Sequence, residues 1–223
     1  MGRPTAEKTG TSRKQFMQLA NVPILIHTVR KFLSCAAVSE IVIATRAEDM
    51  DWVTAQVKKE AAPKPVRVVQ GGDSRQHSVE NALRSIGADV DLVAVHDAVR
   101  PFIDVSIIEK VISEAASAGA AIVGVVPVDT VKQIRKNKIR QTIPREHLVL
   151  AQTPQAFRTA LLRQAFQKAR EDNFTGTDEA SLVERLEQVE VSVVPGSDRN
   201  IKITKPADME LARLFLAQEI GLT

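Results

Sequence analysis

The chain has 223 residues, of which 44% are hydrophobic, so it can bury the core of one sizeable domain. Its formal net charge of +3 is slight, and no basic cluster or nucleic-acid-binding motif accompanies it, so we expect no nucleic-acid partner. We find no apolar run long enough to span a bilayer and no apolar signal core near the N-terminus. The lone Cys35 excludes an internal disulfide and suits a reducing compartment. Together these features predict a cytoplasmic protein without a membrane partner.

Short β-branched runs alternate with longer amphipathic stretches, a pattern typical of a mainly parallel sheet covered by helices. Pro23 fits a first helical turn, and Gly87 and Gly119 follow two predicted helix ends. The pattern predicts helices at 23–33, 50–59, 78–86 and 106–118, and strands at 40–44, 66–69, 92–95 and 121–128. We therefore expect a doubly wound α/β fold in a single domain covering residues 1–223.

The periodicity changes between Val131 and Ile143, where polar and apolar residues alternate imperfectly around Lys136-Asn137-Lys138. This predicts two short strands joined by a turn, forming a β-hairpin arm at about residues 131–150. Two interpretations are open. The hairpin can be an exposed edge guarded by lysines, or a dimerisation arm, because an isolated hairpin is only marginally stable in water. The rest of the sequence predicts helices at 158–170, 177–186 and 206–218 and a strand at 189–194.

The run His96-Asp97-Ala98-Val99-Arg100-Pro101 directly follows the strand predicted at 92–95. In open α/β sheets, ligands bind at the carboxyl ends of the strands. An aspartate at this place can hold a divalent cation, and an arginine three residues later can bind phosphate oxygens with its planar set of donors. We therefore predict a metal and phosphate site that contains Asp97 and Arg100.

A glycine pair also precedes a predicted helix. Gly71-Gly72-Asp73 comes shortly before the helix expected at Ser78, so its backbone can approach a ligand closely while the helix start offers free amides. A Gly-Gly pair is more often part of an ordinary turn, so the motif alone is weak. Asp129-Thr130 similarly ends the predicted fourth strand.

Three further positions have ordinary structural explanations. Thr177 and Asp178 fit a helix cap. Lys202 lies in a short extended segment before the last predicted helix. Lys14 lies near the start of the chain, where a surface lysine is the commoner role. Taken singly, none of these positions indicates a function.

In their order along the chain, however, the motifs resemble those of one family, the 2-C-methyl-D-erythritol 4-phosphate cytidylyltransferases of the non-mevalonate isoprenoid pathway. The resemblance covers nearly the whole chain. It is carried by Lys14-Gln15-Phe16, Pro23-Ile24-Leu25, Gly71-Gly72-Asp73, residues 96–101, Asp129-Thr130, residues 152–157, residues 177–181 and residues 200–204.

The resemblance implies a Rossmann-like nucleotidyltransferase that joins CTP and methylerythritol phosphate into 4-diphosphocytidyl-2-C-methyl-D-erythritol and releases pyrophosphate. It further implies Mg²⁺ as cofactor and a homodimer formed through the arm. The implied catalytic residues are Lys14, which neutralises charge on the triphosphate, Lys202, which holds the sugar phosphate, and Arg145, which reaches the partner subunit's site. Asp97 is the implied metal ligand. The implied substrate-binding residues are Gly72, Asp73, Ser78, Asp97, Ala98, Arg100, Thr130 and Thr177.

One departure from the family concerns the start of the sequence. Family members begin with a strand and a loop of the form Ala-Ala-Gly-x-Gly-x-Arg-Met-Gly, and Met1-Gly2 resembles the final two residues of that loop. Neither Arg3 nor Arg13 follows a glycine-rich turn, so neither replaces the loop's arginine. Either the native start lies upstream or this form is damaged. We expect two neighbouring strands with unpaired backbone groups, and low stability with at most trace activity for a chain that starts at Met1.

Two alternative functions are open. Ribitol 5-phosphate cytidylyltransferases share the motifs at 96–101 and 200–202, although Ser78 and the 177–181 motif favour methylerythritol phosphate. A catalytically impaired nucleotide-binding protein is the other alternative, suggested only by the absent loop. Retention of Lys14, Arg145 and Lys202 argues against it, because binding alone does not require groups directed at a developing charge.

Overall fold

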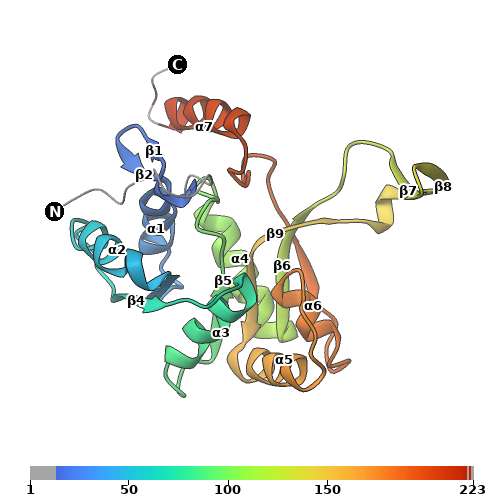
Figure 1. Ribbon diagram of the computed structural model, residues 1–223, viewed down its shortest axis with the longest axis horizontal. Helices are drawn as coiled ribbons and strands as arrows, with labels where there is room; N and C mark the ends of the chain where they lie inside the picture. The colour runs from blue at the N-terminus through green and yellow to red at the C-terminus, as the bar shows by residue number, and fades with distance from the viewer. Residues whose placement is uncertain (1–13, 220, 222–223) are drawn as a thin grey trace.

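The predicted alternation of strands and helices is present in the computed structural model, which describes residues 14–219 and 221 (Figure 1). The helices are α1 (Ile24–Ser34), α2 (Met50–Val57), α3 (Arg75–Ser85), α4 (Val105–Ala118), α5 (Thr159–Glu171), α6 (Glu179–Glu184) and α7 (Pro206–Glu219). Three 3-10 helices accompany them: η1 (Lys14–Phe16), η2 (Ala47–Asp49) and η3 (Arg145–His147). Over the described ranges, no helix has both the length and the apolar character needed to cross a membrane.

The strands form one larger sheet and three pairs. They are β1 (Gln18–Leu19), β2 (Val22–Pro23), β3 (Ile41–Thr45), β4 (Val66–Gln70), β5 (Leu92–Val95), β6 (Ala120–Val125), β7 (Val131–Arg135), β8 (Lys138–Ile143), β9 (Leu150–Arg158) and β10 (Ser192–Pro195). The larger sheet has the order β10-β6-β9-β5, in which β10 is parallel to β6 and β9 is antiparallel to both of its neighbours. Strands β3 and β4 form a separate parallel pair. The expected mainly parallel α/β fold is confirmed.

Strand β9 was not predicted from the sequence. It contains Pro154, and a proline argues against a central strand because it cannot donate to the ladder. The structure accommodates it at an irregularity: Ile122 pairs with Gln155, whereas Gly124 pairs with Ala151, so the register shifts opposite the proline. The motif at residues 152–157 therefore lies within a central strand.

Some predicted boundaries also shift, for local reasons. Helix α3 begins at Arg75, earlier than the predicted Ser78, because the Ser74 side chain caps it by accepting from the amide of His77. Helix α6 is shorter than predicted, and Asp178 rather than Thr177 is its N-cap. Strand β6 ends before the predicted residue 128, and β10 begins after the predicted residue 189.

A cavity of about 780 Å³ separates the two parallel strands β3 and β4 from the larger sheet. It is lined by residues of both β3 and β5, and neither strand is paired on the side facing the other within residues 14–219. Arg75, Ser78 and Asp97 line the cavity near the carboxyl ends of β4 and β5, and Gln15 is another of its polar lining residues. The carboxyl ends of the strands therefore open into a polar cleft.

Strands β7 and β8 form the expected hairpin arm, which extends away from the body of the protein (Figure 1). Lys136 and Asn137 both have positive φ, so they form the kind of two-residue turn whose twist matches that of the two strands. Ile134 and Ile139 are 62% and 65% exposed, respectively. The arm therefore presents apolar side chains that nothing in the described chain covers.

Candidate active site

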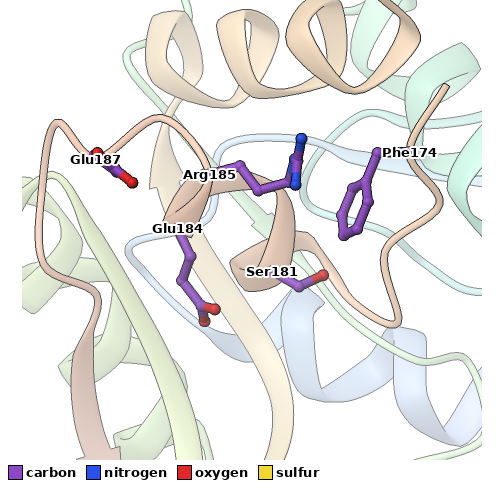
Figure 2. A pocket seen from close by; sticks show the side chains of 5 residues that line it. All are labelled: Phe174, Ser181, Glu184, Arg185 and Glu187. Carbon is purple, nitrogen blue, oxygen red and sulfur yellow. The ribbon is translucent and has the colours of Figure 1, made fainter. Parts of the chain in front are cut away.

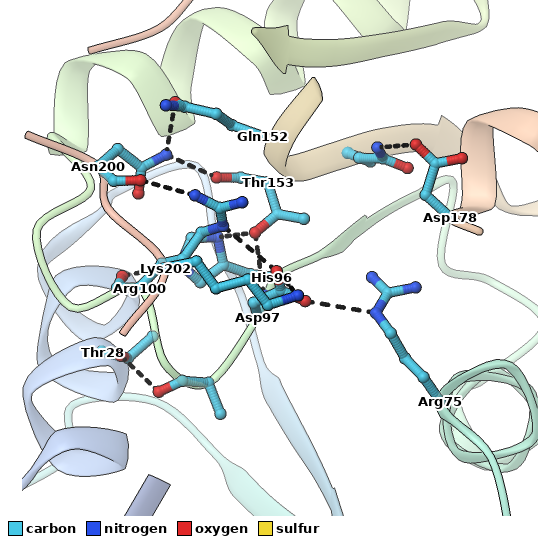
Figure 3. A network of polar contacts seen from close by, with 12 residues as sticks. Thr28, Arg75, His96, Asp97, Arg100, Gln152, Thr153, Asp178, Asn200 and Lys202 are labelled. Atoms are coloured by element: carbon cyan, nitrogen blue, oxygen red, sulfur yellow. Dashed lines mark hydrogen bonds and ion pairs between the residues drawn. The ribbon is translucent and has the colours of Figure 1, made fainter. Parts of the chain in front are cut away.

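Three cationic side chains converge on the carboxylate of Asp97 (Figure 3). Lys202 Nζ lies 3.1 Å from Oδ2, Arg100 Nε lies 3.2 Å from the same oxygen, and Arg75 Nε lies 3.3 Å from Oδ1. The carboxylate is 10% exposed, whereas the lysine side chain is 44% exposed. The cluster therefore offers a solvent-accessible ammonium group beside a largely buried anion.

The electrostatics of Asp97 are set by these neighbours. Burial raises the pKa of its carboxyl group, but the charges of Lys202, Arg75 and Arg100 outweigh burial and lower the pKa below the ordinary value. The carboxylate is therefore ionised at neutral pH. The negative charge of Asp97 orients the side chains of Lys202, Arg100 and Arg75, which can also attract an incoming phosphate.

Buried polar contacts hold the segment after β5 against β9 and the 200–204 segment. Thr153 Oγ1 accepts from the Asp97 amide, and Arg100 Nη1 donates to the carbonyl of Asn200 at 2.7 Å. The Asn200 side chain, which is 0% exposed, donates to Gln152 Oε1 and to the carbonyl of Thr153. Asn200 thus places the backbone that carries Lys202 and joins the motif at 200–204 to the motif at 152–157.

His96 links the same segments in its neutral form. Its Nε2 lies 3.1 Å from the Arg100 carbonyl, which can only accept, so Nε2 carries the proton. Its Nδ1 then accepts from Thr153 Oγ1, at 3.1 Å. Burial lowers the pKa of His96 to about 4, so the imidazole stays neutral at physiological pH.

We expect the stability of the protein to fall between pH 6.5 and about 4 because of His96. The lowered pKa means that the unfolded state takes up this proton first as the pH falls, which costs up to about 3 kcal/mol. The free energy of unfolding in urea, measured across this window, should fall more steeply for the wild type than for His96→Gln. Equal slopes for the two proteins would contradict the assignment of a buried neutral imidazole.

The glycine loop, Gly71-Gly72-Asp73, precedes α3 and is held by a side chain of that helix. Ser78 Oγ accepts from the Gly72 amide at 3.1 Å and donates to the carbonyl of Ser74 at 2.8 Å. A Cβ on Gly72 would lie 2.4 Å from the Cβ of His77, so only glycine fits this approach of loop to helix. Asp73 is exposed at the tip of the loop. In this structure Ser78 therefore shapes the loop.

The structure brings some of the predicted residues together and leaves others apart. Lys202, Asp97 and Arg100 form one cluster, and the Ala98 carbonyl beside it accepts from Thr28. Lys14 lies in η1, adjacent to Gln15, which is one of the residues that line the cavity. The other predicted residues lie outside the cluster: Thr177 is exposed before α6, and Thr130 and Arg145 are exposed beside the arm, where the arginine donates to the carbonyl of Val128.

Two important side chains were missed by the sequence analysis. Arg75 joins Asp97 to Glu179, and Asn200 anchors the Lys202 segment. Arginine after Gly-Gly-Asp-Ser gives no signal of its own, because its partners lie far away in the sequence. Asn200 lies in the motif at residues 200–204, but its burial cannot be predicted from the neighbouring residues.

The residues present do not build a metal site by themselves. The described part of the chain holds no group of three His, Cys, Asp or Glu side chains able to ligate a cation. Both oxygens of Asp97 already have cationic partners. Because Mg²⁺ commonly binds through substrate phosphates and one or two carboxylates, this donor set fits a metal carried by a triphosphate, with Asp97 as the single protein ligand.

A second hollow, of about 480 Å³, lies beside α6 (Figure 2). The guanidinium of Arg185 stacks over the Phe174 ring, 4.2 Å from its centroid, and pairs with Asp172. Its acidic residues, Glu184 and Glu187, are exposed. The hollow therefore lacks the converging charges found around Asp97, and the cluster at the end of β5 is the stronger candidate for chemistry.

An α/β sheet with a glycine loop and clustered cations at its carboxyl edge is suited to binding nucleotides and phosphates. The fold and site are those of a nucleotidyltransferase. A model of the family "2-C-methyl-D-erythritol 4-phosphate cytidylyltransferase" matches residues 3–218, and the chain belongs to this family.

Similar proteins agree in sequence and in structure. The chain is 65% identical to the 2-C-methyl-D-erythritol 4-phosphate cytidylyltransferase of Solibacter usitatus, over 98% of this chain and 91% of that one. It is 52% identical to the corresponding protein of Acidobacterium capsulatum, over 92% and 87% of the two chains. The solved structure of 4-diphosphocytidyl-2C-methyl-D-erythritol synthase from Anaerococcus prevotii superposes with a TM-score of 0.85 at 29% identity, covering 92% of this chain and 90% of that chain. The Francisella tularensis enzyme superposes with a TM-score of 0.77 at 34% identity, covering 90% and 92%.

Proposed function

We propose that this protein transfers the cytidylyl group of CTP to 2-C-methyl-D-erythritol 4-phosphate, giving 4-diphosphocytidyl-2-C-methyl-D-erythritol and pyrophosphate. The observation that carries the proposal is the convergence of Lys202, Arg100 and Arg75 on Asp97 beside the glycine loop. The loop suits the nucleotide, and the exposed ammonium suits a second phosphate. Family membership supports the identity of both substrates.

In the proposed reaction, a phosphate oxygen of methylerythritol phosphate attacks the α-phosphorus of CTP in line. A new P–O bond forms, the bond to the β-phosphate oxygen breaks, and pyrophosphate leaves. Such a transfer depends mainly on positioning and charge stabilisation. Lys202 holds the attacking phosphate, Lys14 neutralises charge that develops on the triphosphate, and Gly72, Asp73 and Ser78 bind the cytidine side.

The cofactor in this proposal is Mg²⁺ bound through the triphosphate. When bound, it supplies positive charge that stabilises the transferring and leaving phosphates. Asp97 would be its protein ligand, and the cationic side chains around that carboxylate would hold the acceptor in place. We include a cytoplasmic location in the proposal, supported by the nucleotide substrate and the free, buried thiol of Cys35.

The proposal also assigns the arm to a homodimer. Arg145 and Thr130 lie beside an arm whose apolar side chains are exposed, and a second copy of the chain would cover those side chains. In such a dimer, the two residues reach the active site of the other subunit. This places a group with a fixed positive charge at each site from across the interface.

The substrates are tested by measuring pyrophosphate release. The assay uses a chain extended upstream of Met1 so that it carries the family's first strand and glycine-rich loop. With Mg²⁺ and CTP, we expect turnover with methylerythritol phosphate and turnover at least about tenfold slower with ribitol 5-phosphate, since a polar group matched to one substrate discriminates strongly against another. Replacing CTP by ATP should also slow the reaction, because in the proposed function the loop backbone supplies hydrogen bonds that a larger purine could not reach. Equal or faster turnover of ribitol 5-phosphate would establish the alternative cytidylyltransferase instead.

A further inference from the structure

We propose that Arg75 is a positioning residue for the acceptor side of the active site. Through Glu179, the first residue of α6, its guanidinium fixes the preceding loop at residues 174–178 relative to Asp97. Figure 3 shows the contact between Arg75 and Asp97. The inference deepens the proposed function, on which the identity of the acceptor rests. It assigns the arginine no contact with the reacting atoms.

The guanidinium joins two carboxylates that come from different parts of the fold. Nη1 and Nη2 donate to the two oxygens of Glu179, at 2.7 and 2.9 Å, and Nε donates to Asp97 Oδ1 at 3.3 Å. The arginine is the first residue of α3, Glu179 is the first of α6, and Asp97 follows β5. A planar group with donors on several nitrogens can hold all these contacts at once, whereas a lysine ammonium is a single point charge.

Glu179 depends on this contact because its side chain is 1% exposed. Burial raises the pKa of its carboxyl group, and the paired Arg75 opposes that rise. A buried carboxylate without its partner is strongly disfavoured. The ion pair therefore holds the first turn of α6 in a defined position against the first turn of α3.

Besides Arg75, a second residue of α3 holds the loop at residues 174–178 close to that helix. The Gln76 side chain donates to the Phe174 carbonyl at 3.3 Å and accepts from the Gly176 amide at 3.0 Å. A Cβ on Gly176 would lie 2.5 Å from Ser181 Oγ, so the loop passes close to α6 as well. Fixed points thus lie on both sides of Thr177, the exposed residue that the proposed function assigns to substrate binding.

Helix α3 therefore connects the nucleotide side of the proposed active site with its acceptor side. Its N-terminus carries the glycine loop on the nucleotide side, and Arg75 and Gln76 hold the 174–178 loop on the acceptor side. Weakening the Arg75 contacts should release the acceptor loop and loosen Asp97 while the Gly72–Ser78 contact stays in place. The expected kinetic defect is consequently in the use of methylerythritol phosphate.

The test is Arg75→Lys, which keeps the positive charge and loses the planar set of donors. We expect the KM for methylerythritol phosphate to rise about tenfold, with kcat and the KM for CTP changed by less than about twofold. We also expect amide hydrogen exchange to accelerate in the peptide covering 174–181. The double variant Arg75→Gln/Glu179→Gln leaves no unpaired buried charge, and it should show the same two changes if the lysine variant fails to fold.

The matched control is Arg84→Lys. This arginine also lies in α3 and pairs with a buried glutamate, Glu80, which is 8% exposed, but it has no contact with the Asp97 cluster among the described residues. The control should leave the acceptor KM and the 174–181 exchange unchanged. Equal effects in the Arg75 and Arg84 variants would show a general structural role and overturn the proposal, as would unchanged acceptor KM and exchange in the Arg75 variants.

The hydrogen-exchange measurement separates this inference from the proposed function. If a chain extended upstream of Met1, with the family's first strand and glycine-rich loop, does not turn over methylerythritol phosphate, the proposed function is wrong. Faster exchange at 174–181 in the Arg75 variants alone would then still support loop positioning, and unchanged exchange would reject it.

Discussion

Replacing Lys14 by alanine is expected to lower kcat about 100-fold, with much smaller changes in the KM of either substrate. The ammonium is needed most when negative charge develops on the triphosphate, and loss of one such stabilising group typically costs about 100- to 1000-fold in kcat. Lys14 lies in η1 next to Gln15, which lines the same cavity as Asp97. In the proposed function, Lys14 provides electrostatic stabilisation rather than substrate affinity.

The companion variant, Lys202→Ala, should show the opposite pattern. Its ammonium lies 3.1 Å from Asp97 Oδ2 and is accessible to a bound phosphate, so its loss should raise the KM for methylerythritol phosphate about 10- to 100-fold. Direct CTP binding should change by less than about twofold. Steady-state kinetics with each substrate varied, together with calorimetric CTP titration, measures both variants.

A reversal of these two kinetic patterns would show that the roles proposed for Lys14 and Lys202 are exchanged. Lys168→Ala provides a control, because that lysine pairs with Asp172 on an exposed face near the end of α5. Its removal should leave kcat and both KM values unchanged. A similar loss in the control would indicate that the effects come from altered net charge.

Mixing two inactive variants is expected to restore activity if the arm reaches across a dimer. Arg145→Ala and Lys14→Ala should each be nearly inactive, since each site lacks one cation. In a mixed dimer, one of the two sites receives an intact Arg145 from one subunit and an intact Lys14 from the other. With random exchange of equal amounts, about half of the dimers are mixed and each has one complete site, so about a quarter of the wild-type activity should return.

Subunit exchange must first be demonstrated by native mass spectrometry on labelled chains. Mixing Arg145→Ala with unlabelled Arg145→Ala is the control and should restore nothing. Given exchange, an absence of recovery would place Arg145 in its own subunit's site or outside both sites. A protein that remains monomeric would contradict the dimer itself.

Local sequence patterns predicted much of the fold. The strand at Leu92–Val95 has the predicted bounds, and helix α4 differs from its prediction by one residue at its start, because its apolar spacing and the glycine that follows it are local signals. The hairpin was likewise predicted from alternation and the turn at Lys136-Asn137. Local order along the chain also identified the His96-Asp97 motif at a strand end.

Only the tertiary structure decided which distant groups meet. The sequence does not show that Arg75 pairs with Glu179, because neither residue has a distinctive local pattern and the contact depends on how α3 and α6 pack. Strand β9 was hidden for a related reason: all of residues 152–157 are buried, and Pro154 is tolerated only at a register shift defined by its neighbour strand.

The sequence by itself determined the α/β class, the arm and the residue types of the candidate site, because periodicity and motif spacing are properties of neighbouring residues. The tertiary structure alone decided that Lys202, Arg100 and Arg75 share one carboxylate, that Asn200 is buried beneath them, and that a cavity separates β3 from β5. The pKa of Asp97 and the separation of the two strands depend on distances between segments remote in sequence. Such distances are set by packing, which no local pattern contains.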